Sequence, residues 1–267
     1  FGTESFDDLY TSYESDGSVP RKTIGAQELF LDILKERAET GRLYIMNIDH
    51  CNSHSSFLDK VEMSNLCQEI TLPTKPLEHI DDPNGEIALC ILSAVNVGKI
   101  RDLDDLKVLC DLAVRSLDEL IDFQNYPINA AEIATKARRS LGIGFIGLAH
   151  YLAKHGHDYN DPGAWQLVHN LTEAFQYYLI SATVDLAEEK GACEYSSRTK
   201  YGNGILPIDT YKHDVDEIVP NELHYDWEDL RLRVKKHGVR NSTLSAQMPS
   251  ESSSVVSNAT NGIEPPR

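Results

Sequence analysis

The sequence predicts an α/β protein, because short apolar runs alternate along the chain with longer segments of helical periodicity. The runs at residues 43–48 and 87–97 are brief enough for buried strands, whereas residues 102–122 and 163–190 repeat their apolar residues at helical spacing. Hydrophobic residues make up 41% of the 267 positions, which suffices for a substantial core in one or two domains and disfavours global disorder.

The amino-terminal third is expected to contain a helix followed by two strands. Residues 26–40 repeat apolar side chains at helical spacing, and Gly41 follows as a suitable C-cap. The short apolar run 43–48 predicts a buried strand, and residues 49–64 form a polar loop. Residues 87–97 are expected to be partly strand.

The middle of the chain is predicted to be mainly helical. Residues 102–122 form a strongly amphipathic helix. Its apolar residues near one face are Leu103, Leu106, Leu109, Leu117, Leu120 and Ile121. Residues 129–155 continue as a helix with a glycine-rich interruption at 142–147, and residues 163–190 form a further long helix that Gly191 closes.

The carboxyl-terminal part combines one more helix with a polar tail. Asp226 is expected to cap a helix over residues 227–237, which Gly238 ends. Within the tail, residues 249–254 read PSESSS. If a helix or tight turn begins there, consecutive N–H groups and serine hydroxyls could bind a phosphate; the alternative is an ordinary serine-rich loop.

Charge and cysteine content narrow the classes of partner. The chain has 25 Lys and Arg against 42 Asp and Glu, a net charge of −17, which repels nucleic-acid backbones. No apolar run approaches the roughly 20 residues that cross a bilayer, so no membrane partner is expected. Five widely spaced cysteines without a CxxC motif indicate a reducing compartment, and we expect a cytoplasmic protein.

Two motifs offer weak hints of cofactor or metal binding. Residues 142–147 have the pattern GxGxxG, but the residues before them resemble the end of a helix rather than the strand that a dinucleotide site requires. Close packing of a helix is the alternative. His50, Cys51 and His54 could ligate a metal, but a tetrahedral site needs three or four ligands and no second cluster stands out. A structured polar loop is the alternative there.

Residues 65–69, with the sequence NLCQE, combine three reactive groups at short spacing. In an extended segment Asn65, Cys67 and Glu69 would lie on one side, where they would present an amide, a thiol and a carboxylate to one substrate. The thiol could serve as a nucleophile, redox group or radical carrier, and the carboxylate as a general base. The alternative is an inert buried cysteine beside a surface glutamate.

Several segments, taken in order, resemble the large (α) subunit of class I ribonucleotide reductases, and the resemblance covers essentially the whole chain. These segments are NLCQE at 65–69, NGEIALC at 84–90, WEDL at 227–230, GVRNSTLSAQMP at 238–249, SESS at 250–253 and the stretch 257–267. The resemblance implies part of a ten-stranded α/β barrel with a finger loop that carries the catalytic cysteine. It further implies a leading helical segment at 1–42 and a partial barrel at 43–267.

The resemblance also implies a role for each matching residue. Cys67 would become a thiyl radical and abstract the 3′ hydrogen of a ribonucleoside diphosphate, and Glu69 would take the 3′-hydroxyl proton. Asn65 would hydrogen-bond the ribose. Cys90 would be one of two thiols that are oxidised to a disulfide as the 2′-hydroxyl leaves as water.

The diphosphate of the substrate would be held by the serine segment, through Pro249, Ser250, Glu251, Ser252 and Ser253. The implied partners are a small (β) subunit whose diiron-tyrosyl centre supplies the radical, a thioredoxin- or glutaredoxin-type reductant, complementary α-subunit segments and a second α subunit. No cofactor or metal is expected in this chain itself.

Such large subunits are more than twice as long as this chain. The ATP-binding cone, the effector loops, the second redox thiol, the tyrosine relay and the carboxyl-terminal cysteine pair have no counterpart in it. The isolated chain is therefore expected to be inactive. The alternatives are a non-catalytic, structural or complementing fragment of the same fold, and a cysteine hydrolase that uses Cys67.

Overall fold

A computed structural model describes residues 4–220 and 222–266 of the chain. The chain divides into two units, residues 1–53 and 54–267, which are described separately here.

The first unit contains helices α1 (Glu4–Ser15) and α2 (Ala26–Thr40) and most of α3 (Ile48–His54). Helix α2 confirms the helix predicted at these residues, and Gly41 ends it in the left-handed conformation at φ +65°. None of its residues is buried, and the Phe30 side chain is 59% exposed. Helix α1 had no counterpart among the predicted elements.

The strand predicted at residues 43–48 is wrong. Residues 43–47 have no regular structure, and α3 begins at Ile48. A strand needs a neighbour for its N–H and C=O groups, and in the described part of the first unit no strand is present to provide one. The polar loop predicted at 49–64 is likewise shortened by α3.

The second unit is built around two parallel strands. Strand β1 (Ile91–Asn96) lies within the apolar run 87–97 and pairs with β2 (Leu141–Ile146), with Ile91 opposite Leu141. Ser245 adds a parallel bridge to Ile143 on the other side of β2. The α/β class is therefore confirmed, but the sheet that the described residues form is open and does not close into a barrel.

Strand β2 occupies the stretch that was expected to interrupt a helix. All six of its residues are buried, and its two glycines allow close packing. A Cβ atom on Gly142 would lie 2.5 Å from Leu92 Cδ2, and one on Gly144 would meet the carbonyl oxygen of Ala246. Close packing thus explains the glycines, although it is packing of a strand and not of a helix.

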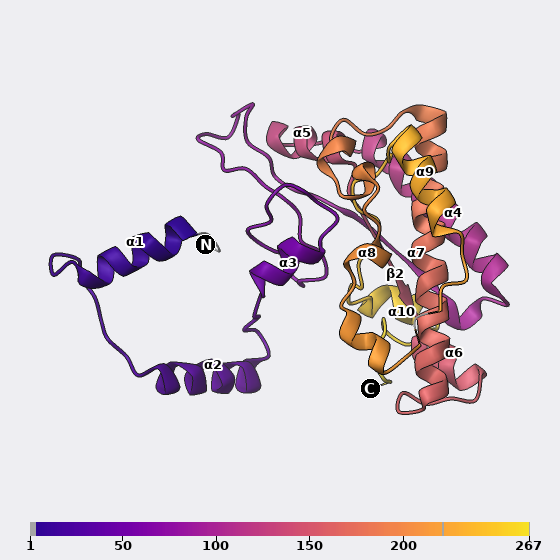
Figure 1. The fold of residues 1–267 in the computed structure, drawn as a ribbon, viewed down its shortest axis with the longest axis horizontal. Helices are drawn as coiled ribbons and strands as arrows, with labels where there is room; N and C mark the ends of the chain where they lie inside the picture. Colours follow the sequence, from indigo (N-terminus) through magenta and orange to yellow (C-terminus); the bar gives the residue numbers. More distant parts are fainter. Residues whose placement is uncertain (1–3, 221, 267) are drawn as a thin grey trace. The chain divides into compact units, whose positions relative to one another are not determined.

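Helices surround this sheet, and the longest, α7 (Pro162–Lys190), lies against α4 (Leu103–Phe123) and α9 (Trp227–His237) (Figure 1). These three helices confirm the predicted ones within two residues at each end. Asp226 accepts a hydrogen bond from Asp229 N–H, as expected for an N-cap. The shorter helices are α5 (Asn129–Arg138), α6 (Leu148–Lys154), α8 (Pro207–Thr210) and α10 (Glu251–Val256). Short 3₁₀ turns lie at Val97–Lys99, Ser196–Arg198, Tyr201–Asn203 and His213–Glu217.

The core lies between α4, α7 and the face of β2 opposite its glycines. Helix α4 contributes Leu106, Cys110, Val114, Leu117 and Ile121, which recur every three or four residues. The apolar face predicted for this helix was partly wrong, because Leu109 and Leu120 are exposed.

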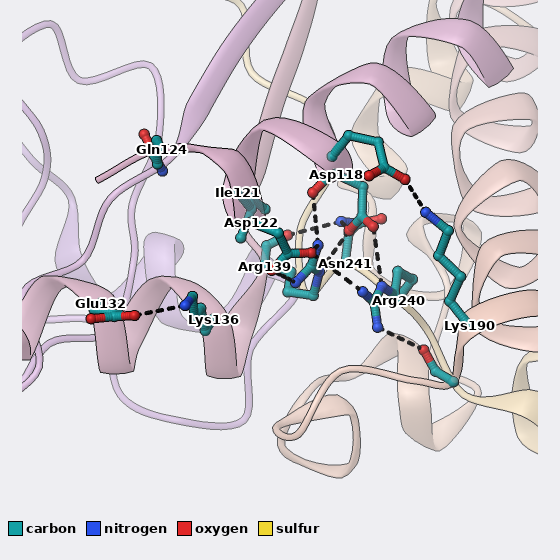
Figure 2. A network of polar contacts seen from close by, with 12 residues as sticks. Asp118, Ile121, Asp122, Gln124, Glu132, Lys136, Arg139, Lys190, Arg240 and Asn241 are labelled. Atoms are coloured by element: carbon teal, nitrogen blue, oxygen red, sulfur yellow. Dashed lines mark hydrogen bonds and ion pairs between the residues drawn. The ribbon is translucent and has the colours of Figure 1, made fainter. Parts of the chain in front are cut away.

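A buried network of charged groups joins α4 to two later segments (Figure 2). The Asp118 carboxylate, 1% exposed, accepts hydrogen bonds from Arg139 Nε at 2.6 Å, Arg240 Nε at 3.1 Å and Asn241 Nδ2 at 3.0 Å. Arg139 also binds Asp122 through both terminal nitrogens, at 3.0 and 2.8 Å. The network holds Arg139, just after α5, and residues 240–241, which come just before the segment that bridges to β2 at Ser245.

Candidate active site

The segment that contains Cys67 is a closed loop. Asn65 N–H donates to Ile70 O at 3.4 Å, and Ile70 N–H donates to Asn65 Oδ1 at 3.3 Å. Gln68 adopts φ +59° and donates its N–H to Asn65 O. The extended alternation expected for residues 65–69 is therefore wrong, because the asparagine side chain offers the backbone a local turn instead.

The loop exposes its tip and turns its carboxylate inward. Leu66 is 86% exposed and Cys67 is also exposed, whereas Glu69 is half-buried and Ile70 is buried. Glu69 Oε2 is shielded from solvent and accepts no hydrogen bond from any residue that the structure describes. A buried carboxylate oxygen without a donor is costly in a structural role, and it is a free acceptor for a ligand.

Cys90 lies directly before β1 and is half-buried. Burial, followed by the negative charge of Glu69, raises the pKa of its thiol to about 11. Cys90 is therefore a neutral thiol at physiological pH. Asn65 and Ile70 of the loop line the same cavity as Cys90, so the loop and the start of β1 are near neighbours.

Two small adjoining cavities connect these residues. One, of about 250 Å³, is lined by Asn65 and Ile70 on one side and by Cys90 on the other. The second, of about 190 Å³, is lined by Glu69, Ile70 and the segment beside β2. The first cavity thus brings Asn65 and Cys90 together, Glu69 lines the second, and Cys67 lies at the exposed loop tip.

The residues that follow the serine segment lie at the other end of the two strands. Asn96 Nδ2, at the end of β1, donates to Ser257 O at 3.4 Å, and Gly147 N–H, just after β2, donates to Thr260 O at 2.9 Å. Ligands of parallel sheets commonly bind beyond the carboxyl ends of the strands.

Within this segment, α10 begins at Glu251 directly after Ser250, as the phosphate-binding interpretation required. Ser250 is buried and donates its N–H to Asn261 Oδ1 at 2.7 Å. Asn261 Nδ2 in turn donates to Glu251 Oε1 at 3.2 Å. Pro249, Glu251, Ser252 and Ser253 are exposed.

The structure gives no support for a cofactor site at residues 142–147 or a metal site at residues 50–54. Gly142 and Gly144 lie inside β2, and of the three glycines only Gly147 lies in the turn between β2 and α6, so they do not form the glycine-rich loop that a dinucleotide site requires. Residues 48–54 form helix α3, so the polar loop proposed there is also wrong. Among the described residues, no group of three His, Cys, Asp or Glu side chains could hold a metal ion.

Sequence reasoning missed a buried ion cluster beside the cysteines. Glu86 is 2% exposed and accepts from Arg138 Nε at 3.1 Å and Nη2 at 2.8 Å, while Arg138 Nη1 donates to Asp59 at 2.9 Å. The available signal was a charged residue, Glu86, at the head of the apolar run that leads to Cys90.

Comparison with known proteins identifies the family. The family described as "Ribonucleotide reductase, barrel domain" matches residues 1–267. This chain belongs to the ribonucleotide reductase barrel family. It is 58% identical over 267 residues to ribonucleoside-diphosphate reductase subunit alpha of Haemophilus influenzae, and 58% identical to ribonucleoside-diphosphate reductase 1 subunit alpha of Escherichia coli. Each alignment covers 99% of this chain and 35% of the relative.

A more distant relative of the reductase family is the ribonucleoside-diphosphate reductase large subunit of Plasmodium falciparum, 32% identical over 271 residues. That alignment covers 98% of this chain and 32% of the relative. The chain thus spans about a third of the length of these curated relatives. None of the helices in its described part has both the length and the apolar character needed to cross a membrane.

Proposed function

We propose that this chain is the part of a ribonucleoside-diphosphate reductase α subunit that carries the radical cysteine and half of the redox thiol pair. The observation that carries the proposal is the closeness of the Cys67 loop, in which Glu69 has a buried and unbonded carboxylate oxygen, to the neutral thiol of Cys90. Cys67 lies two residues before Glu69, on a loop that hydrogen bonds hold closed. The substrate would be a ribonucleoside diphosphate and the product its 2′-deoxy counterpart.

Three residues of the loop, Cys67, Glu69 and Asn65, have roles in the first half of the proposed reaction. A thiyl radical on Cys67 would abstract the 3′ hydrogen of the ribose, and Glu69 Oε2 would accept the 3′-hydroxyl proton. After the 2′ position is reduced, Cys67 would return the hydrogen atom to C3′ and so regenerate the thiyl radical, while Glu69 would return the proton. Asn65 uses Oδ1 to close the loop, so its Nδ2 donor is the group we assign to the ribose oxygens. The exposed loop tip suits a thiol that must receive a radical from another subunit.

Cys90 serves the second half of the reaction. The C2′–O bond breaks, the oxygen leaves as water, and a new C2′–H bond forms. The two electrons come from two thiols that become a disulfide, and the second thiol lies elsewhere in the subunit. Because the pKa of Cys90 is about 11, its thiol keeps a proton at neutral pH and can give it to the departing hydroxyl.

We assign substrate anchoring to the segment from Pro249 to Ser253. The exposed hydroxyl of Ser252 and the first N–H groups of α10 offer donors to a diphosphate without any need for net positive charge. The Glu251 carboxylate is held by Asn261 and would orient this segment rather than contact the phosphates, since like charges repel. Ser250 would stabilise the turn through the hydrogen bond from its N–H to Asn261 Oδ1.

The proposal includes partners that supply what this chain does not. A small subunit with a diiron-tyrosyl centre would supply the radical, and a thioredoxin- or glutaredoxin-type protein would reduce the disulfide. Further α-subunit segments would extend the open sheet into the ten-stranded barrel, with residues 65–70 as its finger loop. These segments would also bind the ATP and dNTP effectors and would form the contact with a second α subunit. All five cysteines are unpaired in the structure, which suits a reducing compartment such as the cytoplasm.

The test is reduction of CDP to dCDP by the α subunit that contains this chain, reconstituted with the radical-generating subunit and a dithiol. We expect Cys67→Ser to abolish turnover and Glu69→Gln to slow it by roughly 10²- to 10⁴-fold. Cys51→Ser, which removes a half-buried thiol of the first unit, is the matched control and should retain activity. Full activity of Cys67→Ser would refute the proposal, and a folded but inactive wild-type assembly would favour a structural role.

A further inference from the structure

Arg138, at the end of α5, contacts both of the segments that lead to the two proposed catalytic thiols. Its side chain is 3% exposed and binds two carboxylates, Asp59 and Glu86. The guanidinium carbon lies 4.9 Å from the ring centroid of Tyr195 and 5.9 Å from that of Phe57. Rings on its faces and carboxylates at its edges leave this guanidinium a single orientation.

Asp59 fixes the start of the segment that leads into the Cys67 loop. It accepts from Arg138 at 2.9 Å and is paired with Arg198 Nη2 at 2.8 Å. Two residues earlier, Phe57 forms an antiparallel bridge with Thr199. The chain therefore leaves a rigid anchor at residues 57–59 and enters the loop six residues later.

Glu86 joins the end of the same loop to the segment that leads to Cys90. Lys75 and Glu86 form an antiparallel bridge, in which each backbone N–H donates to the other residue's carbonyl at 3.1 Å. Their side chains are also paired, with 2.6 Å between Lys75 Nζ and Glu86 Oε1. Both strands of this bridge are thereby tied to Arg138.

The bridge lies at one end of the cavity that separates the two segments. Leu72 and Thr74 line one wall of this cavity, and Ala88 and Cys90 line the opposite wall. The spacing of the bridged pair therefore sets how far the segment that leads to Cys90 lies from the segment that follows the Cys67 loop.

We infer that Glu86 is a positioning residue, which through Lys75 and Arg138 holds Cys90 at a fixed distance from the Cys67 loop and so sets the rate of the chemical step. The catalytic role of the two cysteines in this inference rests on the proposed function. The placement of Cys90 does not, and it can be measured without turnover. Ionic groups suit this task because their geometry is directional, whereas apolar contacts allow sliding.

The decisive variant is Lys75→Met, because the Lys75 side chain is 48% exposed and its loss spares the core. With the reconstituted enzyme and CDP, we expect kcat to fall on the order of 10- to 100-fold with KM nearly unchanged, since misplacement of about 1 Å carries such a cost. Lys75→Arg, which keeps the charge, should restore kcat. Glu86→Gln should show the same kcat loss together with lower stability.

Asp118→Asn is the matched control, because it disrupts a buried ion cluster at the same end of α5, through Arg139, while the hydrogen bonds of Asp118 reach neither residues 57–75 nor residues 86–90. It should lower stability without lowering kcat. A kcat of Lys75→Met equal to that of the wild type, or a loss that Asp118→Asn reproduces, would overturn the inference.

A second readout separates this inference from the proposed function. We expect iodoacetamide to alkylate Cys90 several-fold faster in Lys75→Met than in the wild type, with no change in Asp118→Asn. Removal of a cation alone disfavours a thiolate, so faster alkylation would report a wider cavity and not a charge effect. An unchanged alkylation rate would overturn the positioning role, whereas a faster rate in an enzyme without CDP reductase activity would refute only the proposed function.

Discussion

Replacement of Asp118 by asparagine removes the negative charge at the centre of the network in Figure 2. The carboxylate is 1% exposed and accepts from Arg139, Arg240 and Asn241 at 2.6 to 3.1 Å. Disruption of a buried ion pair by removal of one partner costs about 3–5 kcal/mol. Asparagine keeps one acceptor oxygen, and Arg139 keeps Asp122, so we expect the lower end, about 3 kcal/mol.

Urea denaturation followed by circular dichroism measures this change as a lower midpoint at constant slope. The same loss corresponds to a melting temperature roughly 6–12 °C lower for a domain of this size. Glu132→Gln is the control in the same region, because it breaks an exposed ion pair with Lys136 and should change the midpoint far less. A loss below about 1 kcal/mol for Asp118→Asn would refute the view that these buried charges depend on one another.

Three further predictions concern the site and its supports. Alkylation of Cys90 should be slow at pH 8 and increase up to about pH 11, because burial and the Glu69 charge raise its pKa to about 11; a plateau near pH 9 in a mass-spectrometric time course would contradict this. Gly144→Ala should lower the free energy of unfolding by about 1–3 kcal/mol through a clash with Ala246, whereas Gly17→Ala, which has no neighbour within 4 Å, should not. Burial alone would raise the pKa of Glu86, but the Lys75 and Arg138 pairs outweigh it and hold the pKa below its usual value. Glu86 therefore stabilises the fold at neutral pH, and this contribution is lost as the pH falls below about 4; urea midpoints between pH 7 and 3 should fall less steeply in Glu86→Gln.

The long helices could be predicted from the sequence because their signals are local. Apolar periodicity and end residues such as Asp226 and Gly191 defined α9 and α7 within two residues. The strands could not be predicted as well, because strand formation depends on a partner far along the chain. The apolar run 43–48 has no described partner and is not a strand, whereas the glycine-rich stretch 142–147 became β2 because β1 lies beside it.

The sequence singled out the segment that contains the candidate site, but it did not predict the conformation of that segment. The NLCQE segment suggested alternation, whereas the structure closes it through Asn65 Oδ1 and a left-handed Gln68. Competition between a side-chain oxygen and the backbone is a three-dimensional outcome that spacing does not reveal. The bridge between Lys75 and Glu86 likewise joins two residues that no motif in the sequence connects.

The most direct test of the account is a single turnover with CDP in the absence of external reductant, followed by mass-spectrometric mapping of disulfides in the reconstituted enzyme. The account predicts one dCDP for each active subunit, with Cys90 oxidised to a disulfide and Cys67 recovered as a free thiol. Formation of dCDP while Cys90 remains fully reduced would contradict the assignment of Cys90 as a reductant.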